Sequence, residues 1–294
     1  MAGDCSFSEP HILDLRFVDS ELIFVGSSHG NLIKYILESD GAKYHIKTGR
    51  KSSRDNPNLF GIEPLVEQVC YEFSKLLELP CAKEELCLAK IRLYEEDIVT
   101  IVNKSEDFAK GFNGEITLNE ILALNIVESP KVENVIGKLN QKDLILKLLL
   151  FDFLILNEDR HNGNISWLVD NDGNLVFSPV FDNGYSLLYD DVKGMISGYK
   201  TAIKLANCNS DFYGGSFHNM EVLILNNRED LLSLLDKLHA GDPENILDKV
   251  QESYRRLSPY VNRTVLVPEL WFRRVSEFLK WRISYVRNLC LDVE

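Results

Sequence analysis

The longest apolar run in the chain covers residues 144–156 and is interrupted only by Lys147 and Asp152. It is too short to span a bilayer, and its composition predicts a helix that is buried on all sides. A polar segment, Asn-Glu-Asp-Arg-His-Asn-Gly-Asn, follows at once and ends at Asn164. We therefore expect a fold built around one buried helix that holds polar side chains rigidly at its end.

The composition is that of a globular protein. The 294 residues are 45% hydrophobic and 26% charged, so the chain can form a substantial core. Its formal net charge of −13 argues against a nucleic acid or an anionic membrane surface as the main partner, because both require a dense cationic surface. We expect neither direct nucleic-acid binding nor membrane binding.

The cysteines and the first residues indicate a cytoplasmic protein. Residues 1–10 contain neither a basic segment nor an apolar one, so no secretory signal is expected there. The six cysteines are spaced too widely for a zinc ribbon or a thioredoxin motif. They are typical of the reduced, partly buried thiols of an intracellular protein.

The character of the chain changes near residue 103. Before it, alternating or short apolar runs predict strands at residues 11–18, 22–25, 32–37, 44–48, 87–93 and 98–103, with a hairpin turn at 40–41 and one helix at 64–77. After it, we expect helices at residues 118–127, 141–156, 220–238, 242–257 and 268–291, and one hairpin at 165–169 and 175–180. The pattern predicts an α+β fold with a strand-rich N-lobe at 1–105, a mostly helical C-lobe at 106–294, and a ligand-binding cleft between them.

Three oxygen-bearing side chains are expected to converge at the end of the buried helix. Asp159 and Asn164 follow the helix directly, and the predicted hairpin returns the chain to Asp182 in Pro-Val-Phe-Asp-Asn-Gly. Mg²⁺ prefers oxygen ligands, and kinases use one Asp to orient a hydroxyl and an Asn and a second Asp to hold metal. Such residues also abound in ordinary turns, but the combined pattern favours a phosphoryl-transfer site.

This segment resembles the catalytic core of the HipA-like serine/threonine kinases, above all the small bacterial cell-translocating kinase type. The shared motifs are Asp-Arg-His-Asn-Gly-Asn and Pro-x-Phe-Asp-x-Gly. The resemblance implies a two-lobed protein-kinase-like fold that uses ATP and Mg²⁺. It implies that Asp159 is the catalytic base, that Asn164 and Asp182 are metal ligands, and that Arg160 and His161 support the loop. For His161, a purely structural hydrogen-bonding role is the common alternative.

The resemblance extends to Lys47, which occupies the strand position where these kinases carry a phosphate-contacting lysine. If Tyr44 and Ile46 pack inward, strand alternation turns Lys47 toward the cleft, although a solvated lysine is the alternative. On the helix at 64–77, Glu67 and Glu72 fall just beyond opposite edges of the apolar arc, so either could border the cleft. The resemblance favours Glu67 as the partner of Lys47, although an ordinary solvated glutamate is again the alternative.

A loop with small residues precedes Lys47 in the sequence. Its residues Gly26, Ser27, Ser28, Gly30 and Asn31 are expected to form a turn whose backbone N–H groups cover the phosphates. The loop does not match Gly-x-Gly-x-x-Gly. We interpret Ser27 and Ser28 as plain turn serines, and autophosphorylation of one of them, which the resemblance implies, is the alternative.

The last predicted helix carries a stripe of basic residues among aromatic ones, made up of Arg273, Arg274, Lys280, Arg282 and Arg287. We interpret the stripe as the solvated face of an amphipathic helix, and an acidic partner as the alternative.

The function implied by the resemblance is transfer of the ATP γ-phosphoryl group to a serine or threonine hydroxyl of a protein, with adenine against residues 101–108. The family includes toxins neutralised by a separate antitoxin and effectors delivered into host cells, so a regulatory partner or delivery as an effector would fit it. Two alternatives stay open: a phosphoinositide-type lipid kinase, whose catalytic loop is also similar, and a catalytically inactive kinase-fold binding module. The acidic net charge counts against the lipid kinase.

Overall fold

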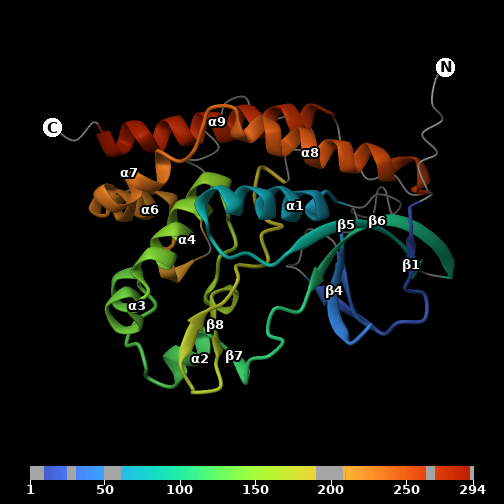
Figure 1. The fold of residues 1–294 in the computed structure, drawn as a ribbon, viewed down its shortest axis with the longest axis horizontal. Helices are drawn as coiled ribbons and strands as arrows, with labels where there is room; N and C mark the ends of the chain where they lie inside the picture. The colour runs from blue at the N-terminus through green and yellow to red at the C-terminus, as the bar shows by residue number, and fades with distance from the viewer. Residues whose placement is uncertain are drawn as a thin grey trace.

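The structure is a computed structural model that combines a six-stranded sheet, a smaller three-stranded sheet and a set of helices (Figure 1). It describes residues 10–24, 31–49, 61–93, 95–189, 208, 210–262 and 269–291. The α+β fold class predicted from the sequence is confirmed, with most strands before residue 106 and most helices after it.

The six-stranded sheet has the strand order β1-β5-β6-β4-β3-β2. Its strands are β1 (Ile12–Asp14), β2 (Ser20–Phe24), β3 (Asn31–Ser39), β4 (Ala42–Thr48), β5 (Glu84–Leu93) and β6 (Glu96–Glu106). Neighbouring strands are antiparallel, except that β1 pairs with β5 in parallel at one edge. The predicted hairpin turn joins β3 to β4, and both its central residues, Asp40 and Gly41, have the positive φ that such a turn requires.

One helix, α1 (Glu63–Ser74), lies between this sheet and the helix α8 (Asp242–Leu257), and a short 3₁₀ turn (Lys75–Leu77) extends it (Figure 1). Pro64 stands in the first turn, where its missing N–H group costs nothing. The helix contacts β5 and β6 on one side and α8 on the other. Because it is covered on both sides, most of its residues are buried, including the charged Glu63 and Glu67.

The remaining described elements surround α4 (Lys142–Ile155), which is the buried helix predicted from the apolar run. Every residue of α4 from Ile145 onward is buried. In the described part of the chain, no helix combines the length and apolarity needed to cross a membrane. The other elements are β7 (Gly114–Thr117), β8 (Ser166–Val169) and β9 (Leu175–Phe177), which form the small sheet, and α2 (Leu118–Ala123), α3 (Val132–Leu139), α6 (Phe217–Asn226), α7 (Arg228–Leu235) and α9 (Glu269–Leu291).

Several predicted boundaries were wrong. The helix expected at 220–238 is two helices, because Asn227 interrupts it and its side-chain amide donates to the carbonyl of Leu223 at 2.8 Å. The helix expected at 118–127 ends at Ala123, and Asn125 then takes a left-handed conformation that asparagine tolerates well. The strand β7 and the helix α3 were not predicted, although α3 has apolar residues at helical spacing.

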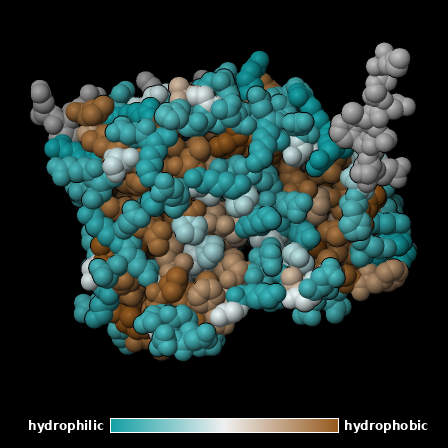
Figure 2. Space-filling model, in the orientation of Figure 1, coloured by the Kyte–Doolittle hydropathy of each residue, from teal (hydrophilic) through white to brown (hydrophobic). Residues whose placement is uncertain are grey.

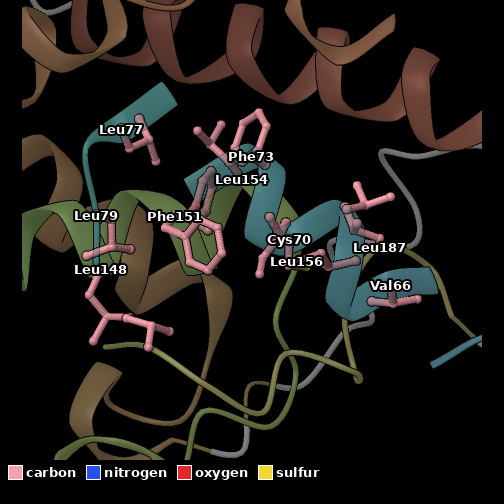
Figure 3. Close-up of a cluster of buried hydrophobic side chains, with 14 of the residues drawn as sticks. Val66, Cys70, Phe73, Leu77, Leu79, Leu148, Phe151, Leu154, Leu156 and Leu187 are labelled. Atoms are coloured by element: carbon pink, nitrogen blue, oxygen red, sulfur yellow. The ribbon is translucent and has the colours of Figure 1, made fainter. Parts of the chain in front are cut away.

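A continuous hydrophobic core joins the two parts of the molecule. Figure 3 shows side chains of α1 and α4 meeting there, with Phe73 and Phe151 stacked at 6.4 Å between ring centroids. Leu187, from the segment that follows the small sheet, lies in the same cluster. The sheet and the helical part are therefore in contact through α1 and α4, and any cleft between them must lie to one side of this core.

The basic stripe on α9 is only in part the solvated face that its pattern predicted, since Arg273 is exposed and Arg282 is not. Arg282 is completely buried, donates to the carbonyl of Phe153 and lies 3.8 Å from the centre of that ring. Burial lowers the pKa of Arg282 to about 9. Arg287 donates to the carbonyl of Leu235, the last residue of α7, and to that of Leu238. Arg282 and Arg287 therefore help to hold the helical part together.

Candidate active site

Lys47 on β4 lies between two carboxylates that come from distant parts of the chain. Its Nζ is 2.9 Å from Oδ1 of Asp182 and 3.5 Å from Oε1 of Glu67 on α1. Strand alternation causes this placement, since Ile46 is fully buried on the opposite face of β4. Glu67 is held in turn, because its second oxygen accepts from the backbone N–H of Asn183 at 2.9 Å.

The segment that carries Asp182 is anchored next to the end of α1. The N–H of Val180 donates to the carbonyl of Pro80, and the N–H of Ala82 donates to the carbonyl of Val180, both at 2.8 Å. Asp182 itself has a φ of 60°, an uncommon conformation for a residue other than glycine. Such a conformation persists only where the surroundings enforce it, and here the contacts on either side fix Asp182 beside Lys47.

Asp159 and Asn164 lie on the loop that leaves the end of α4. Leu156 ends that helix in a left-handed conformation, with a φ of 54°, and turns the chain sharply. The amide nitrogen of Asn164 donates to the backbone carbonyl of Asp159 at 3.2 Å, which closes the loop. The side-chain oxygen of Asn157 accepts from the N–H of Asp159 at 3.0 Å. Asp159 is half-buried and Asn164 is buried, so both are held by the loop rather than by solvent.

Arg160 ties this loop to the segment of Asp182. Its guanidinium is completely buried and pairs with Asp152 of α4 through two bonds of 2.9 and 3.0 Å. It also donates to the carbonyl of Phe181 at 2.7 Å and to the side-chain oxygen of Asn183 at 2.5 Å. Because Phe181 and Asn183 flank Asp182, a single side chain positions both predicted metal-binding segments.

The charges around Lys47 determine its protonation. Burial by itself lowers the pKa of Lys47, but the carboxylates of Asp182 and Glu67 more than offset this and raise it well above its usual value. The same ammonium holds the pKa of Asp182 well below its usual range. At neutral pH the site therefore presents a fixed positive charge beside a fixed carboxylate. The Asp182 side chain is 39% exposed, so it is open to a ligand.

Two further buried polar groups share the face of the sheet that carries Lys47. Asn103 of β6 is paired with Lys47, and Glu84 of β5 lies two residues from the strand position opposite Asn103. The side-chain nitrogen of Asn103 and Oε2 of Glu84 are both buried without a hydrogen-bond partner. Burial, together with the charge of Glu67, raises the pKa of Glu84 to about 8. Unpaired groups of this kind are costly and are typical of ligand sites.

The other residues predicted for the site have different surroundings. His161 is exposed, and its Nδ1 accepts from the N–H of Gly163 at 3.1 Å, so it holds the turn after Asp159. Glu72 points to Lys75 and to Lys249 of α8, and Glu67 is the glutamate that reaches Lys47. Residues Gly26, Ser27, Ser28 and Gly30 lie outside the described residues, as does the side chain of Asn31.

Three residues that hold the site were not singled out from the sequence. They are Asp152, Asn183 and Tyr213, whose hydroxyl donates to Oδ2 of Asp152 at 2.7 Å. One signal was available, since an aspartate inside a fully apolar helix must be paired when the helix is buried. Its partner could not be inferred, because Tyr213 lies far along the chain. Phe108, at the end of the segment expected to meet adenine, contacts the ring of Phe181 at 5.6 Å.

The site is open to solvent on one side, because the Asp182 side chain is partly exposed. Figure 2 shows the surface indented between the six-stranded sheet and the region of β7 and β8. The residues that converge here fit a magnesium nucleotide chemically. The oxygens of Asn164 and Asp182 are the hard ligands that Mg²⁺ prefers, and the ammonium of Lys47 is a donor for phosphate oxygens.

Comparison with known proteins shows that the fold of this chain is similar to that of solved structures. No family model and no curated protein matches the chain. Among solved structures, the proinflammatory kinase CtkA of Helicobacter pylori matches with a TM-score of 0.61 at 17% identity, over 97% of this chain and 100% of CtkA. HipA of Shewanella oneidensis, solved with HipB and operator DNA, matches with a TM-score of 0.46 at 14% identity, over 91% of this chain and 67% of HipA.

A Golgi casein kinase matches with a TM-score of 0.43 at 10% identity, over 95% of this chain and 75% of that one. The likeness to CtkA carries the argument, because it covers both chains almost from end to end. At this identity it is a likeness of fold. It shows that the chain has the fold of the kinase CtkA, which confirms the two-lobed kinase-like fold predicted from the sequence.

Proposed function

We propose that this protein is an ATP- and Mg²⁺-dependent serine/threonine protein kinase of the HipA-like type. The observation that carries the proposal is the position of the Lys47 ammonium between Glu67 and Asp182. These three groups are far apart in the sequence, and the packing of a hydrophobic core does not require two carboxylates around one lysine. The same arrangement of a strand lysine, a helix glutamate and a metal-binding aspartate serves phosphoryl transfer in protein kinases.

Each residue then has a defined task. Lys47 binds phosphate oxygens of the nucleotide, and Glu67 keeps its ammonium in place when Asp182 turns to the metal. Asp159 orients the acceptor hydroxyl and takes its proton. Asn164 and Asp182 would hold Mg²⁺, which neutralises charge on the phosphate oxygens when it is bound. Arg160 touches no reactant and acts by positioning the loop and the segment of Asp182.

The proposal is tested with purified protein, γ-labelled ATP, Mg²⁺ and a cell lysate as the source of acceptors. The Asp159→Asn variant should lose about 10²–10⁴ in transfer rate, the usual cost of removing a positioned general base. The Asp172→Asn variant is the matched control, because Asp172 lies in the exposed turn between β8 and β9 and should keep full activity. Circular dichroism should show both variants folded.

The alternatives give different outcomes in the same experiment. Labelling of phosphoinositide vesicles but of no lysate protein would identify a lipid kinase. Nucleotide binding without any transfer would identify an inactive binding module. Full activity of the Asp159→Asn variant would overturn the assignment of Asp159 as the base. Hydroxylamine-resistant phosphoserine or phosphothreonine in the labelled proteins would support a serine or threonine hydroxyl as the acceptor.

A further inference from the structure

A groove of about 540 Å³ lies between α8 and α9, at the surface and away from Lys47. Its floor is apolar and comes from both helices, with Leu247 of α8 and Leu270 and Phe272 of α9. Leu247 and Phe272 are almost completely buried. A small apolar side chain of another molecule could therefore be covered there without displacing the core.

The rim of this groove is acidic. It carries Glu244 and Asp248 from α8 and Glu269 and Glu277 from α9, with Arg273 as the basic residue in the lining. Two of the acids already have exposed basic neighbours, since Glu244 pairs with Lys280 and Glu269 with Arg255. Such exposed pairs are weak and exchange readily with other cations. Asp248 has no ion pair within the described residues.

An independent feature of the groove points to a ligand with hydrogen-bonding groups. Ser276 is 8% exposed and lines the groove, and its hydroxyl has no hydrogen-bond partner. A hydroxyl buried in this way costs about 1–3 kcal/mol, which a peptide group placed beside it would recover. Because Ser276 lies on a helix one turn after Phe272, the unpaired group and the apolar floor are neighbours.

We propose that this groove docks a basic segment of a partner protein. An apolar side chain of the segment fills the space over Leu247 and Phe272. Its backbone pairs with the hydroxyl of Ser276, and lysine or arginine side chains lie against the acidic rim. The acidic rim favours a basic occupant, because the carboxylates of the rim would repel an acidic segment.

The position of the groove connects it to the candidate active site. The helix α8 packs against α1 and β5, and Lys249 of α8 pairs with Glu72 of α1 at 2.8 Å. The helix α1 also carries Glu67, the partner of Lys47. An occupant of the groove would therefore brace the helix that places this glutamate.

The test measures fluorescence anisotropy of a short labelled peptide that contains lysine, arginine and one leucine, titrated with the full chain in the absence of nucleotide. The control peptide keeps the leucine and replaces the basic residues with glutamate. Saturable binding of the basic peptide that weakens with salt is expected. The Asp248→Lys variant should weaken it about three- to tenfold.

Two variants keep this result interpretable. Asp236→Lys makes the same charge change at an exposed residue after α7, outside the groove, and should bind like the native chain. Ser276→Ala should weaken peptide binding without lowering the melting temperature, because the hydroxyl makes no bond in the free protein.

Equal binding of the two peptides, or equal effects of Asp248→Lys and Asp236→Lys, would overturn the proposal. Dimerisation of the native chain that Asp248→Lys abolishes would also overturn it, by showing a second copy as the occupant. Since no nucleotide is present, these outcomes are separate from the success or failure of the proposed kinase activity.

Discussion

Two clusters of charge meet at Asn183, and they differ in their access to solvent. The sealed cluster is Asp152, Arg160 and Tyr213, all of which are buried. The open cluster is Lys47, Glu67 and Asp182, in which the Asp182 side chain is 39% exposed. Asn183 links them, because its side-chain oxygen accepts from Arg160 and its backbone N–H donates to Glu67.

The difference separates support from chemistry. In the sealed cluster every carboxylate oxygen of Asp152 and several donors of Arg160 are used within the protein, so nothing is left for a ligand. In the open cluster Lys47 is shared between two carboxylates, and the carboxylate of Asp182 is partly exposed to solvent. Under the proposed function, a nucleotide with its metal would take over contacts in the open cluster while the sealed cluster keeps both loops in place. Loss of a residue of the open cluster should mainly affect activity, and loss of a residue of the sealed cluster should mainly affect folding.

The largest effect is expected from Arg160→Met, which leaves the Asp152 carboxylate buried without its cation. The free energy of unfolding should fall by about 3–5 kcal/mol, the usual cost of breaking a buried pair on one side. Urea unfolding followed by tryptophan fluorescence measures it. Adding Asp152→Asn to this variant should restore part of the loss, because the stranded charge is removed. A loss below about 1 kcal/mol would show that the sealed cluster does not support the fold.

Asp182→Asn tests the open cluster. Phosphoryl transfer should fall about 10²–10³-fold, the range seen when one charge-stabilising group is lost from an active site. The free energy of unfolding should change by less than about 1 kcal/mol, because solvent screens an exposed carboxylate. Initial rates and urea unfolding, measured on one preparation, give both numbers. A loss of stability as large as that of Arg160→Met would erase the distinction between the two clusters.

Glu84→Gln should have almost no effect near about pH 5 and sharpens the description of the open cluster at higher pH. The pKa of Glu84 is raised from 4.5 to about 8 in the folded protein, so folding favours its protonated form. The resulting stabilisation is complete below the unfolded pKa and is lost as the pH rises toward the folded pKa. Glutamine does not ionise, so the variant keeps its stability as the pH rises.

Thermal melts should therefore coincide for the native chain and Glu84→Gln near about pH 5 and diverge by about pH 9, with the variant melting higher. The exposed Glu133→Gln on α3 serves as the control and should follow the native chain at both pH values. A constant difference across this range would mean that Glu84 does not titrate there.

Much of the fold followed from local patterns, and the failures have local causes. The apolar run predicted α4 closely, and Asp40-Gly41 predicted its hairpin, since both depend on neighbouring residues alone. The helix at 220–238 was predicted too long because an asparagine side chain that bonds to the backbone can end a helix without any change in apolar spacing. Arg282 was misassigned because periodicity shows which residues share a face of a helix and does not show which neighbouring helix covers it.

The candidate site divides in the same way. The residue types and motif spacing singled out Asp159, Asn164 and Asp182, and the resemblance to the HipA-like kinases singled out Lys47. The sequence left Glu67 and Glu72 equivalent by geometry, since both lie at the edge of the apolar arc of one helix. Only the tertiary structure decided between them, by placing β4 and the segment of Asp182 beside Glu67 and α8 beside Glu72. The pairing of Asp152 with Arg160 and Tyr213 was likewise decided by folding, because contacts between distant segments depend on how elements pack and not on the pattern within any one of them.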